Sequence, residues 1–339
     1  MNHLDLFSGI GGFSLAIKQA GIKHGWHGHS EIDKHANNIF RRHFEESKEL
    51  GGIESIEPRD LPELDLVTFG FPCQDLSIAG KRGGLQAARS GLFFEAMRII
   101  RAKRPRYIIF ENVKGLLSSN EGHDFIICLQ EIANAGYDGQ WQLCNTRWVL
   151  PQNRERVFFI GHLRGQPRPE VFPIEGGFRE GEELGQVFPT ILSRDHKGVG
   201  NQEMALVQVD SIANGDAGRV FDPSGISCTL KAEGGGWGAK TGLYEVKPVL
   251  TPNRAEKSQN GRRLKEDGED MFTLTSQDQH GVQIGTNIRR LTPTECERLQ
   301  GFPDGWTDDQ SDTQRYRQLG NAVTVPIVKM IIDGMKNVL

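Results

Sequence analysis

The sequence predicts an α/β fold of the Rossmann-like type, with a doubly wound, mostly parallel sheet and a smaller, irregular β-rich domain. Three observations support this fold class. Short apolar strands alternate with helix-spaced apolar residues through residues 1–160. Glycine and unusual polar residues directly follow several of these strands. Residues 165–288 are rich in glycine, proline and polar residues and hold few helical patterns.

The first strand is expected at residues 3–7, and it runs into a glycine-rich turn at 8–12. A helix should follow, because apolar residues recur at helical spacing from Phe13 to Ala20 and Gly21 provides a stop. Later strands are expected at residues 66–69, 107–110, 141–149 and 157–160, and helices at 92–100 and 125–133. Ligands of such sheets bind beyond the carboxyl ends of the strands.

The last part of the chain returns to regular structure. Thr292 is the expected N-cap of a helix, with Pro293 at its first position and Glu295 completing a capping box. Gly301 should end that helix, and a second one is expected from about 323 to 335. We therefore expect one domain of residues 1–164 plus 289–339, with a second domain of residues 165–288 between them.

Composition narrows the classes of protein that the chain could represent. No run of 18 apolar residues occurs in the 339, and the start resembles a strand rather than a signal peptide, so we expect a cytoplasmic protein that spans no membrane. The five cysteines are widely spaced without a C-x-x-C pair, so neither disulfides nor a metal site is expected. The net charge of −4 argues against nonspecific coating of nucleic acid.

The turn at Gly9, Gly11 and Gly12 lets a ligand approach the backbone and a helix N-terminus. No lysine-serine/threonine pair follows, which disfavours a nucleotide triphosphatase. Glu31, about twenty residues later, suits a ribose diol. Taken alone, Glu31 fits a solvated surface acid better.

Cys73 follows a strand in the segment Gly-Phe-Pro-Cys, and a polar loop comes after it. Most thiols are small core residues, but this setting favours an exposed nucleophile. Lys81 and Arg82 could lower the pKa of the thiol or bind phosphate. Glu111 follows another strand, where its carboxylate could hold a ring nitrogen.

Arg154 and Arg156 occupy alternate positions before a strand, so they could point together towards a carbonyl oxygen or a phosphate. A surface ion pair is the simpler interpretation of either residue alone.

Together, these segments resemble the DNA (cytosine-5) methyltransferase family of bacterial or phage type. They follow the order of the family's motifs along the chain, at residues 5–13, 31–33, 70–77, 89–100, 111–113, 152–156, 290–302 and 320–323. The segment 165–288 lies where the family has its target recognition domain. The resemblance thus implies an S-adenosylmethionine-dependent methyltransferase fold, acting as a monomer on double-stranded DNA.

The resemblance implies S-adenosyl-L-methionine as cofactor, with S-adenosyl-L-homocysteine as product. Glycine backbone would lie near the methionine part, Phe7 would pack on the adenine, Glu31 would hold the ribose hydroxyls, and Leu92 and Asn321 would close the pocket. The residues expected at this site are Asp5, Phe7, Ser8, Gly9, Gly11, Gly12, Glu31, Ile32, Ile53, Pro72, Leu92, Asn321 and Val323.

It also implies catalytic roles. Cys73 would add to carbon 6 of a cytosine flipped from the duplex, which activates carbon 5 towards the methyl group. Glu111 would hold N3 and the exocyclic amine, while Arg156, with Arg154 nearby, would hold the O2 side. Water is the candidate base for the carbon 5 proton. Residues proposed to contact DNA are Gln74, Ser77, Lys81, Arg82, Trp237, Arg262 and Arg263.

One departure from the family concerns the adenine. The family often has an aspartate about twenty residues before the catalytic cysteine, where this chain has Gly52, and Asp60 comes later. Two basic clusters, Arg262, Arg263 and Lys265 and then Arg289 and Arg290, could contact phosphate or be solvated.

Two alternative functions use the same motifs. A tRNA cytosine methyltransferase would carry a Cys-Phe-Thr segment in the recognition region, and none occurs here. A DNA-binding regulator without catalysis is disfavoured by the intact Cys73, Glu111, Arg156 and Asn321. The compact layout without regulatory domains predicts a restriction-modification or orphan phage enzyme.

Overall fold

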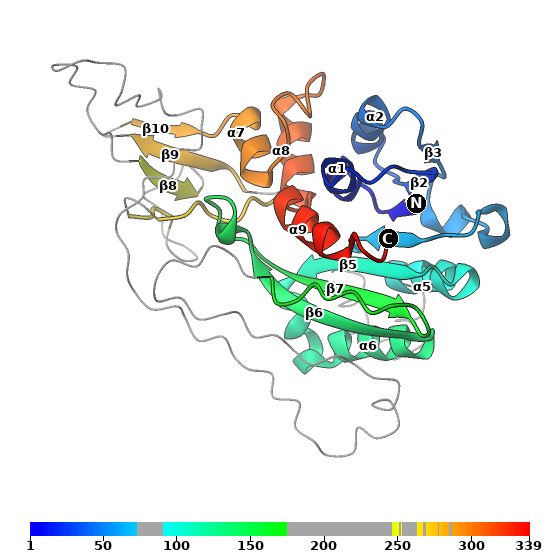
Figure 1. Ribbon diagram of the computed structural model, residues 1–339. Helices are drawn as coiled ribbons and strands as arrows, with labels where there is room; N and C mark the ends of the chain where they lie inside the picture. The colour runs from blue at the N-terminus through cyan, green and yellow to red at the C-terminus, as the bar shows by residue number, and fades with distance from the viewer. Residues whose placement is uncertain are drawn as a thin grey trace. The chain divides into compact units, whose positions relative to one another are not determined.

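The computed structural model describes residues 1–72, 91–174, 246–250, 252, 263–266, 269–276, 278–284 and 287–339. These residues form two compact units. Figure 1 colours the chain by residue number, from blue at the N-terminus to red at the C-terminus. The first unit comprises the described residues in 1–144, 155–209 and 325–339, and the second comprises residues 145–154 with those in 210–324.

The first unit is built on a seven-stranded sheet in the order β3-β2-β1-β4-β5-β7-β6. Its strands are β1 (Asn2–Leu6), β2 (Trp26–Ser30), β3 (Lys48–Glu49), β4 (Leu66–Phe69), β5 (Tyr107–Val113), β6 (Tyr137–Asn145) and β7 (Glu155–Leu163). β3, β2, β1, β4 and β5 pair in parallel, and β7 runs antiparallel to β5. This mixed α/β sheet with helices confirms the predicted Rossmann-like fold class.

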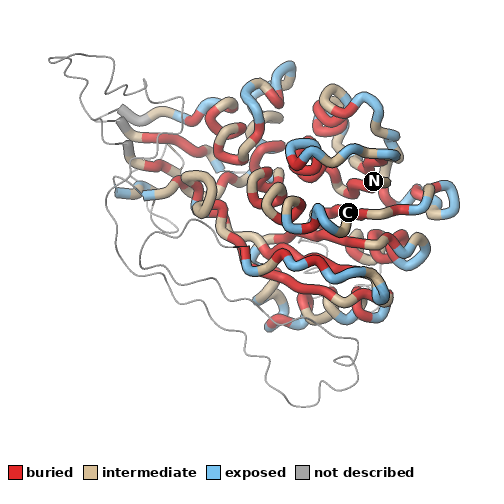
Figure 2. Tube along the Cα trace, in the orientation of Figure 1, coloured by how far each residue is buried: buried red, intermediate tan, exposed pale blue. Residues whose placement is uncertain are grey.

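Helices cover both faces of this sheet, whose strands are largely buried in Figure 2. On one face, α5 (Leu92–Lys103) and α6 (His123–Asn134) pack their apolar residues against β1, β4, β5 and β7. On the other, α1 (Gly12–Gln19) packs against α9 (Val325–Met335), and α2 (Lys34–His43) stacks Phe40 on His29 of β2. Burial of both faces explains why the central strands β4 and β5 are predominantly apolar.

Gly11 shapes the turn between β1 and α1. Its φ of +89° lies in the left-handed region, where a side chain is strained. A Cβ atom there would also lie 2.6 Å from Cε2 of Phe44, which is closer than such atoms approach. The turn therefore needs glycine at this position for both conformation and space.

The second unit contains a three-stranded antiparallel sheet and two helices. Its strands are β8 (Val246–Leu250), β9 (His280–Ile284) and β10 (Asn287–Arg290), and its helices are α7 (Pro293–Gln300) and α8 (Asp312–Asn321). The predicted capping box is confirmed, because Thr292 and Glu295 each accept the other's backbone N–H. Gly301 ends α7 in the left-handed conformation, as expected.

The compact units divide the chain differently from the predicted domains. Residues 145–154 and the stretch from 289 to 324 belong to the second unit, where Gln152 donates to the carbonyl of Leu299 at 2.8 Å. Residues 165–174 belong to the first unit, where Gln140 donates to the carbonyl of Pro169 at 2.6 Å. Hydrogen bonds between distant segments, which composition does not reveal, set these bounds. No helix among the described residues is long and apolar enough to cross a membrane.

Candidate active site

Three strand ends meet at one edge of the first unit's sheet. The parallel registers pair Leu6 with Phe69 and Phe69 with Phe110, so the residues that follow them, Phe7, Gly70 and Glu111, lie at the same level. The glycine-rich turn, the segment that leads to Cys73 and the predicted acid therefore share this edge, as the fold class predicts. Cys73 itself lies outside the described residues.

The turn after β1 presents groups that suit a polar ligand. The Ser8 backbone N–H donates to the carbonyl of Ser30 at 3.1 Å, and its buried hydroxyl has no hydrogen-bond partner in the described part of the chain. A Cβ atom added to Gly9 would meet nothing within 4 Å, so open space lies over this backbone. Gly9 donates its N–H to Oε2 of Glu31 at 2.8 Å.

Glu31 is oriented by the backbone around it. Its Oε1 accepts the N–H groups of Ile32 at 2.9 Å and Asp33 at 2.7 Å, in addition to the bond from Gly9 on Oε2. A carboxylate offers about four acceptor sites, so it keeps capacity for a hydroxyl. Ile32 beside it is 82% exposed, an unusual exposure for a large apolar side chain, and it lies near Gly52. A carboxylate next to an apolar surface is an arrangement that fits a nucleoside.

The remaining predicted cofactor residues fall into different surroundings. Asp5 is fully buried, with its carboxylate accepting the hydroxyls of Ser14 at 2.7 Å and Thr68 at 2.9 Å. Burial raises the pKa of Asp5 to about 7, while the two hydroxyl bonds act in the opposite direction. Both carboxylate oxygens of Asp5 are thus engaged within the protein, where they bind Ser14 of α1 and Thr68 of β4.

Ile53 lies in the apolar core, Leu92 is half-buried at the start of α5, and Pro72 is exposed. Asn321 is exposed at the end of α8 and Val323 is buried; both belong to the second unit. The predicted cofactor residues are therefore distributed over the two compact units.

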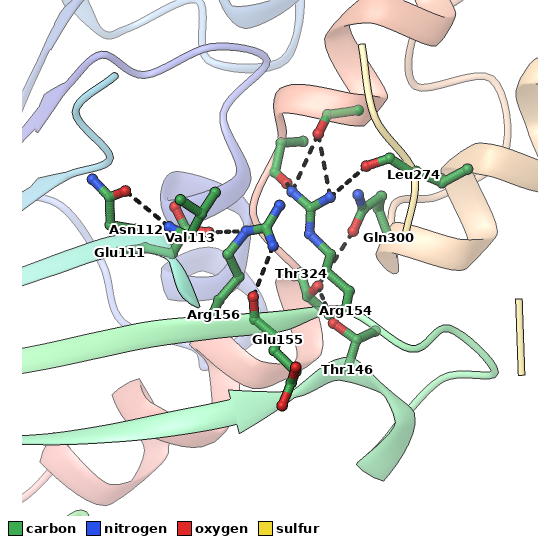
Figure 3. Close-up of polar contacts among 12 residues, drawn as sticks. Glu111, Asn112, Val113, Thr146, Arg154, Glu155, Arg156, Leu274, Gln300 and Thr324 are labelled. Atoms are coloured by element: carbon green, nitrogen blue, oxygen red, sulfur yellow. Dashed lines mark hydrogen bonds and ion pairs between the residues drawn. The ribbon is translucent and has the colours of Figure 1, made fainter. Parts of the chain in front are cut away.

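Glu111 and Arg156 form an ion pair at the sheet edge, with 2.9 Å between Oε1 and Nε (Figure 3). The antiparallel register of β5 and β7 pairs Val113 with Arg156, so Glu111 lies diagonally opposite on the same face, within reach of a long side chain. Both side chains are mostly buried. Arg156 also donates from Nη1 to the carbonyl of Glu155 at 2.8 Å.

The other oxygen of Glu111 lies beside the segment that leads to Cys73. A Cβ atom on Gly70 would be 3.4 Å from Oε2 of Glu111, so glycine leaves room for this carboxylate. Asn112 donates from Nδ2 to the carbonyl of Phe71 at 2.9 Å. The sequence indicated a motif at 111–113 but no role for Asn112. The structure shows that this residue anchors the chain two residues before Cys73.

Arg154 has a different role from the one predicted. Its guanidinium donates to the carbonyls of Leu274, Gly320 and Ala322 at 2.7, 3.2 and 2.7 Å (Figure 3). The side chain is 1% exposed, so it is not available to a cytosine ring. The expectation that it points with Arg156 is corrected because β7 begins only at Glu155, and strand alternation does not apply to residue 154.

Gln152 is a structural residue that the sequence did not identify as such. Its side chain accepts from the backbone of Leu274 at 3.2 Å and donates to Leu299 at 2.8 Å. Arg154 thus fixes the backbone on both sides of Asn321, while Gln152 links Leu274 to Leu299 of α7. The sequence shows an amide two residues before a guanidinium, but the burial that makes both of them structural residues cannot be read from the motif.

The basic clusters are partly engaged within the protein. Arg289 forms two bonds to Glu295, at 2.9 and 2.7 Å, and Arg290 stacks 3.6 Å from the ring centroid of Tyr316. Lys265 donates to the carbonyl of Asp270 at 2.7 Å and covers the ring of Phe272. Arg263 accepts at its carbonyl from Leu250 at 2.7 Å. The other residues predicted to contact DNA lie outside the described residues: Gln74, Ser77, Lys81, Arg82, Trp237 and Arg262.

Two of the other cysteines are unsuited to nucleophilic catalysis. Cys144 and Cys296 are buried, and burial raises the pKa of both thiols, that of Cys296 to about 12. A thiol in such surroundings stays protonated at neutral pH and is a weak nucleophile.

Comparisons with known proteins agree with this geometry. The sequence model of the C-5 cytosine-specific DNA methylase family matches residues 1–337. The chain is 31% identical to the orphan methyltransferase M.SPRI of Bacillus phage SPR, over 98% of this chain and 96% of that one. It is also 31% identical to the type II methyltransferase M.NlaX of Neisseria lactamica, over 98% and 95%.

Solved structures share the fold. A putative DNA modification methyltransferase from an Escherichia coli prophage aligns with a TM-score of 0.59 at 21% identity, covering 100% of this chain and 99% of that one. The Schizosaccharomyces pombe Dnmt2 methyltransferase aligns with a TM-score of 0.57 at 18% identity, covering 99% of each. Since the family model spans nearly the whole chain and close relatives match it end to end, the chain belongs to the C-5 cytosine-specific DNA methylase family.

Proposed function

We propose that this chain transfers a methyl group from S-adenosyl-L-methionine to carbon 5 of a cytosine in double-stranded DNA, with Cys73 as the nucleophile. The observation that carries the proposal is the position of Glu111. One carboxylate oxygen is bound by Arg156 at 2.9 Å, and the other lies over Gly70, three residues before Cys73. A nucleophile and a carboxylate at one sheet edge are what addition to a cytosine ring requires.

The residues around the turn fit the cofactor. Glu31 would accept a ribose hydroxyl, because its carboxylate is held by three backbone N–H groups and retains acceptor capacity. Exposed Ile32 would pack against the adenine, and the Ser8 hydroxyl together with the open backbone at Gly9 would receive the polar methionine part. When bound, the cofactor supplies an electrophilic methyl group on sulfur.

Glu54 is our candidate for the missing adenine acceptor. An ideal Cβ atom on Gly52 would lie 4.0 Å from Oε2 of Glu54, so this carboxylate occupies the space that an aspartate at 52 would reach. The same Cβ atom would lie 3.4 Å from Cγ2 of Ile32, which places the carboxylate beside the proposed adenine surface.

The chain's residues would carry the reaction as follows. The Cys73 thiolate forms a bond to carbon 6, and the electrons of the carbon 5–carbon 6 double bond become available at carbon 5. Glu111 holds N3 and the exocyclic amine, and Arg156 orients this carboxylate. Carbon 5 then takes the methyl group, loses its proton to a base such as water, and the returning electron pair expels Cys73 as thiolate.

Bisulfite sequencing of DNA from cells that express the protein tests both activity and target site. We expect cytosines of one short sequence to resist conversion with the native chain and to convert with the Cys73→Ser variant. Full conversion in both samples would reject the proposed activity, and protection in both would reject Cys73 as the nucleophile. Transfer of labelled methyl groups to purified tRNA but not to duplex DNA would favour the tRNA alternative.

We further propose that the enzyme protects phage or host DNA, either alone or beside a restriction enzyme. Orphan and type II methyltransferases are both among its relatives. A nuclease gene adjacent to this one, whose product cuts the sequence found by bisulfite mapping, would establish the restriction-modification role. Its absence would favour the orphan role.

A further inference from the structure

A row of polar side chains lies on the α1 face of β1 and β2, whereas Leu4 and Leu6 of β1 face the apolar core on the other side of the sheet. His3 of β1 and His27 of β2 are register partners, and both are buried. His24, half-buried in the segment between α1 and β2, stacks on His27 with 4.2 Å between ring centroids and on His3 with 5.3 Å. Because parallel strands covered on both faces are normally aliphatic, three adjacent imidazoles need a specific explanation.

Asp5 fixes the tautomers of two of these histidines. Its carboxylate accepts the hydroxyl protons of Thr68 at 2.9 Å and Ser14 at 2.7 Å. Each hydroxyl oxygen must then accept from its other neighbour, which is Nε2 of His3 at 2.8 Å for Thr68 and Nε2 of His27 at 3.0 Å for Ser14. Both rings therefore carry their proton on Nε2 and keep a lone pair on Nδ1.

Two ring nitrogens of the cluster lack hydrogen-bond partners among the described residues. Nδ1 of His3 and Nε2 of His24 are buried and have no hydrogen-bond partner among the residues that the structure describes. One ring nitrogen of each histidine lies within 4.8 Å of those of the other two.

We propose that His3, His24 and His27 form a binding site for a divalent transition-metal ion such as Zn²⁺, with Asp5, Ser14 and Thr68 orienting the ligands. Neutral imidazoles are preferred ligands of these ions, and metal-binding histidines typically donate their other N–H to an oxygen acceptor. The sequence did not predict this site, because its cysteine spacing indicated no metal site and the three histidines are not in a recognised ligand spacing.

Coordination needs one local adjustment. Nitrogens bound to one ion at about 2.1 Å lie about 3.4 Å apart, so the ligand atoms must approach one another. The ring planes are also nearly parallel, 14–17° apart, whereas ligand rings point their lone pairs at a shared ion. His24 is the residue that turns, because it lies in a connecting segment at the surface. The N-terminal ammonium near it opposes a cation and weakens binding.

Titration with Co²⁺, a spectroscopic substitute for Zn²⁺, tests this site. The full chain is prepared without a histidine tag, treated with chelator and titrated at about pH 8, well above the ordinary pKa of an imidazole. We expect visible absorption bands of tetrahedral Co²⁺ that saturate at one ion per chain and disappear on adding Zn²⁺. His24→Ala should weaken binding by more than about 100-fold, which exceeds the loss typical of residues behind the ligands.

The His123→Asn variant is the matched control, because His123 is exposed at the start of α6, outside the cluster. It should bind Co²⁺ as the native chain does. Thermal unfolding provides the second measurement: Zn²⁺ should raise the unfolding temperature of the native and His123→Asn chains but not of His24→Ala. Absence of saturable binding, or binding that His24→Ala leaves intact, would overturn the proposal. Neither result depends on methyl transfer.

Discussion

Replacing Arg154 with lysine should destabilise the fold, whereas the same change at Arg156 should not. Arg154 donates to three backbone carbonyls from a side chain that is 1% exposed, and two of its bonds measure 2.7 Å. Lysine keeps the charge but lacks the planar, rigid fork of donors, so it cannot bond to all three carbonyls in the geometry that arginine uses. Hydrogen bonds to a charged group each contribute about 1.5–3 kcal/mol, so we expect a loss of about 3–4 kcal/mol.

Urea unfolding followed by tryptophan fluorescence measures this difference, with Trp306 as a buried probe in the second unit. Arg156→Lys is the matched control, because lysine retains an ion pair with Glu111, and we expect it to change the free energy of unfolding by less than about 1 kcal/mol. Methyl transfer should nevertheless fall in this control, since the carboxylate loses its orientation. If Arg154→Lys unfolds within about 1 kcal/mol of the native chain, or both variants lose equal stability, the positioning role of Arg154 is wrong.

Three further predictions concern the sheet edge and the turn. Glu111→Gln should fold normally and slow methyl transfer to duplex DNA by at least about 100-fold, as measured with labelled cofactor; a near-native rate would remove Glu111 from the mechanism. Gly11→Ala should cost about 2–4 kcal/mol in urea unfolding, because its Cβ atom meets Phe44 at 2.6 Å in a left-handed conformation. Gly9→Ala, with φ of +54° but open space, should cost only about 1–2 kcal/mol, and equal costs would contradict the steric argument. Asp5 has its pKa raised to about 7, so the native state holds a proton that the unfolded state releases, and stability is lost as pH rises from about 4 through about 7. The difference in unfolding free energy between the native chain and Asp5→Asn should therefore fall by roughly 2–3 kcal/mol between about pH 5 and about pH 7.5, and a constant difference would refute the assignment.

The elements with strong local signals could be predicted from the sequence. β4 occupies residues 66–69 as expected, since its short, mainly apolar run lies between Asp65 and Gly70, and α7 begins at its capping box. α2 and α8 were not predicted, because each has few apolar residues to establish a period. Asp33 is the N-cap of α2, and its side chain accepts from the backbone of His35 and Ala36, a local contact that composition alone does not distinguish from a loop.

Strand ends were the weaker part of the prediction, and they decided the details of the site. β6 ends at Asn145 rather than 149, because the side chain of Asn145 caps a short 3₁₀ turn at Thr146–Trp148. β5 continues through Glu111 to Val113, because β7 pairs with it that far. The motif was therefore enough to propose Glu111 as a site residue, but its ion-pair partner followed only from a register that joins residues more than forty positions apart.

The direction of β7 explains how an arginine reaches the edge of the sheet where β1, β4 and β5 have their carboxyl ends. In the parallel strands only the carboxyl ends lie at that edge, so the turn after β1, the segment after β4 and Glu111 on β5 all come from strand ends. β7 runs the opposite way, so its first residues lie at the same edge and its last ones at the other. Arg156, the second residue of β7, can thus bind Glu111. If β7 ran parallel to β5, a residue from the carboxyl end of β7 would lie beside Glu111 instead. The antiparallel strand is therefore the feature of the sheet that lets a basic residue at the start of a strand hold the acid at the end of its neighbour.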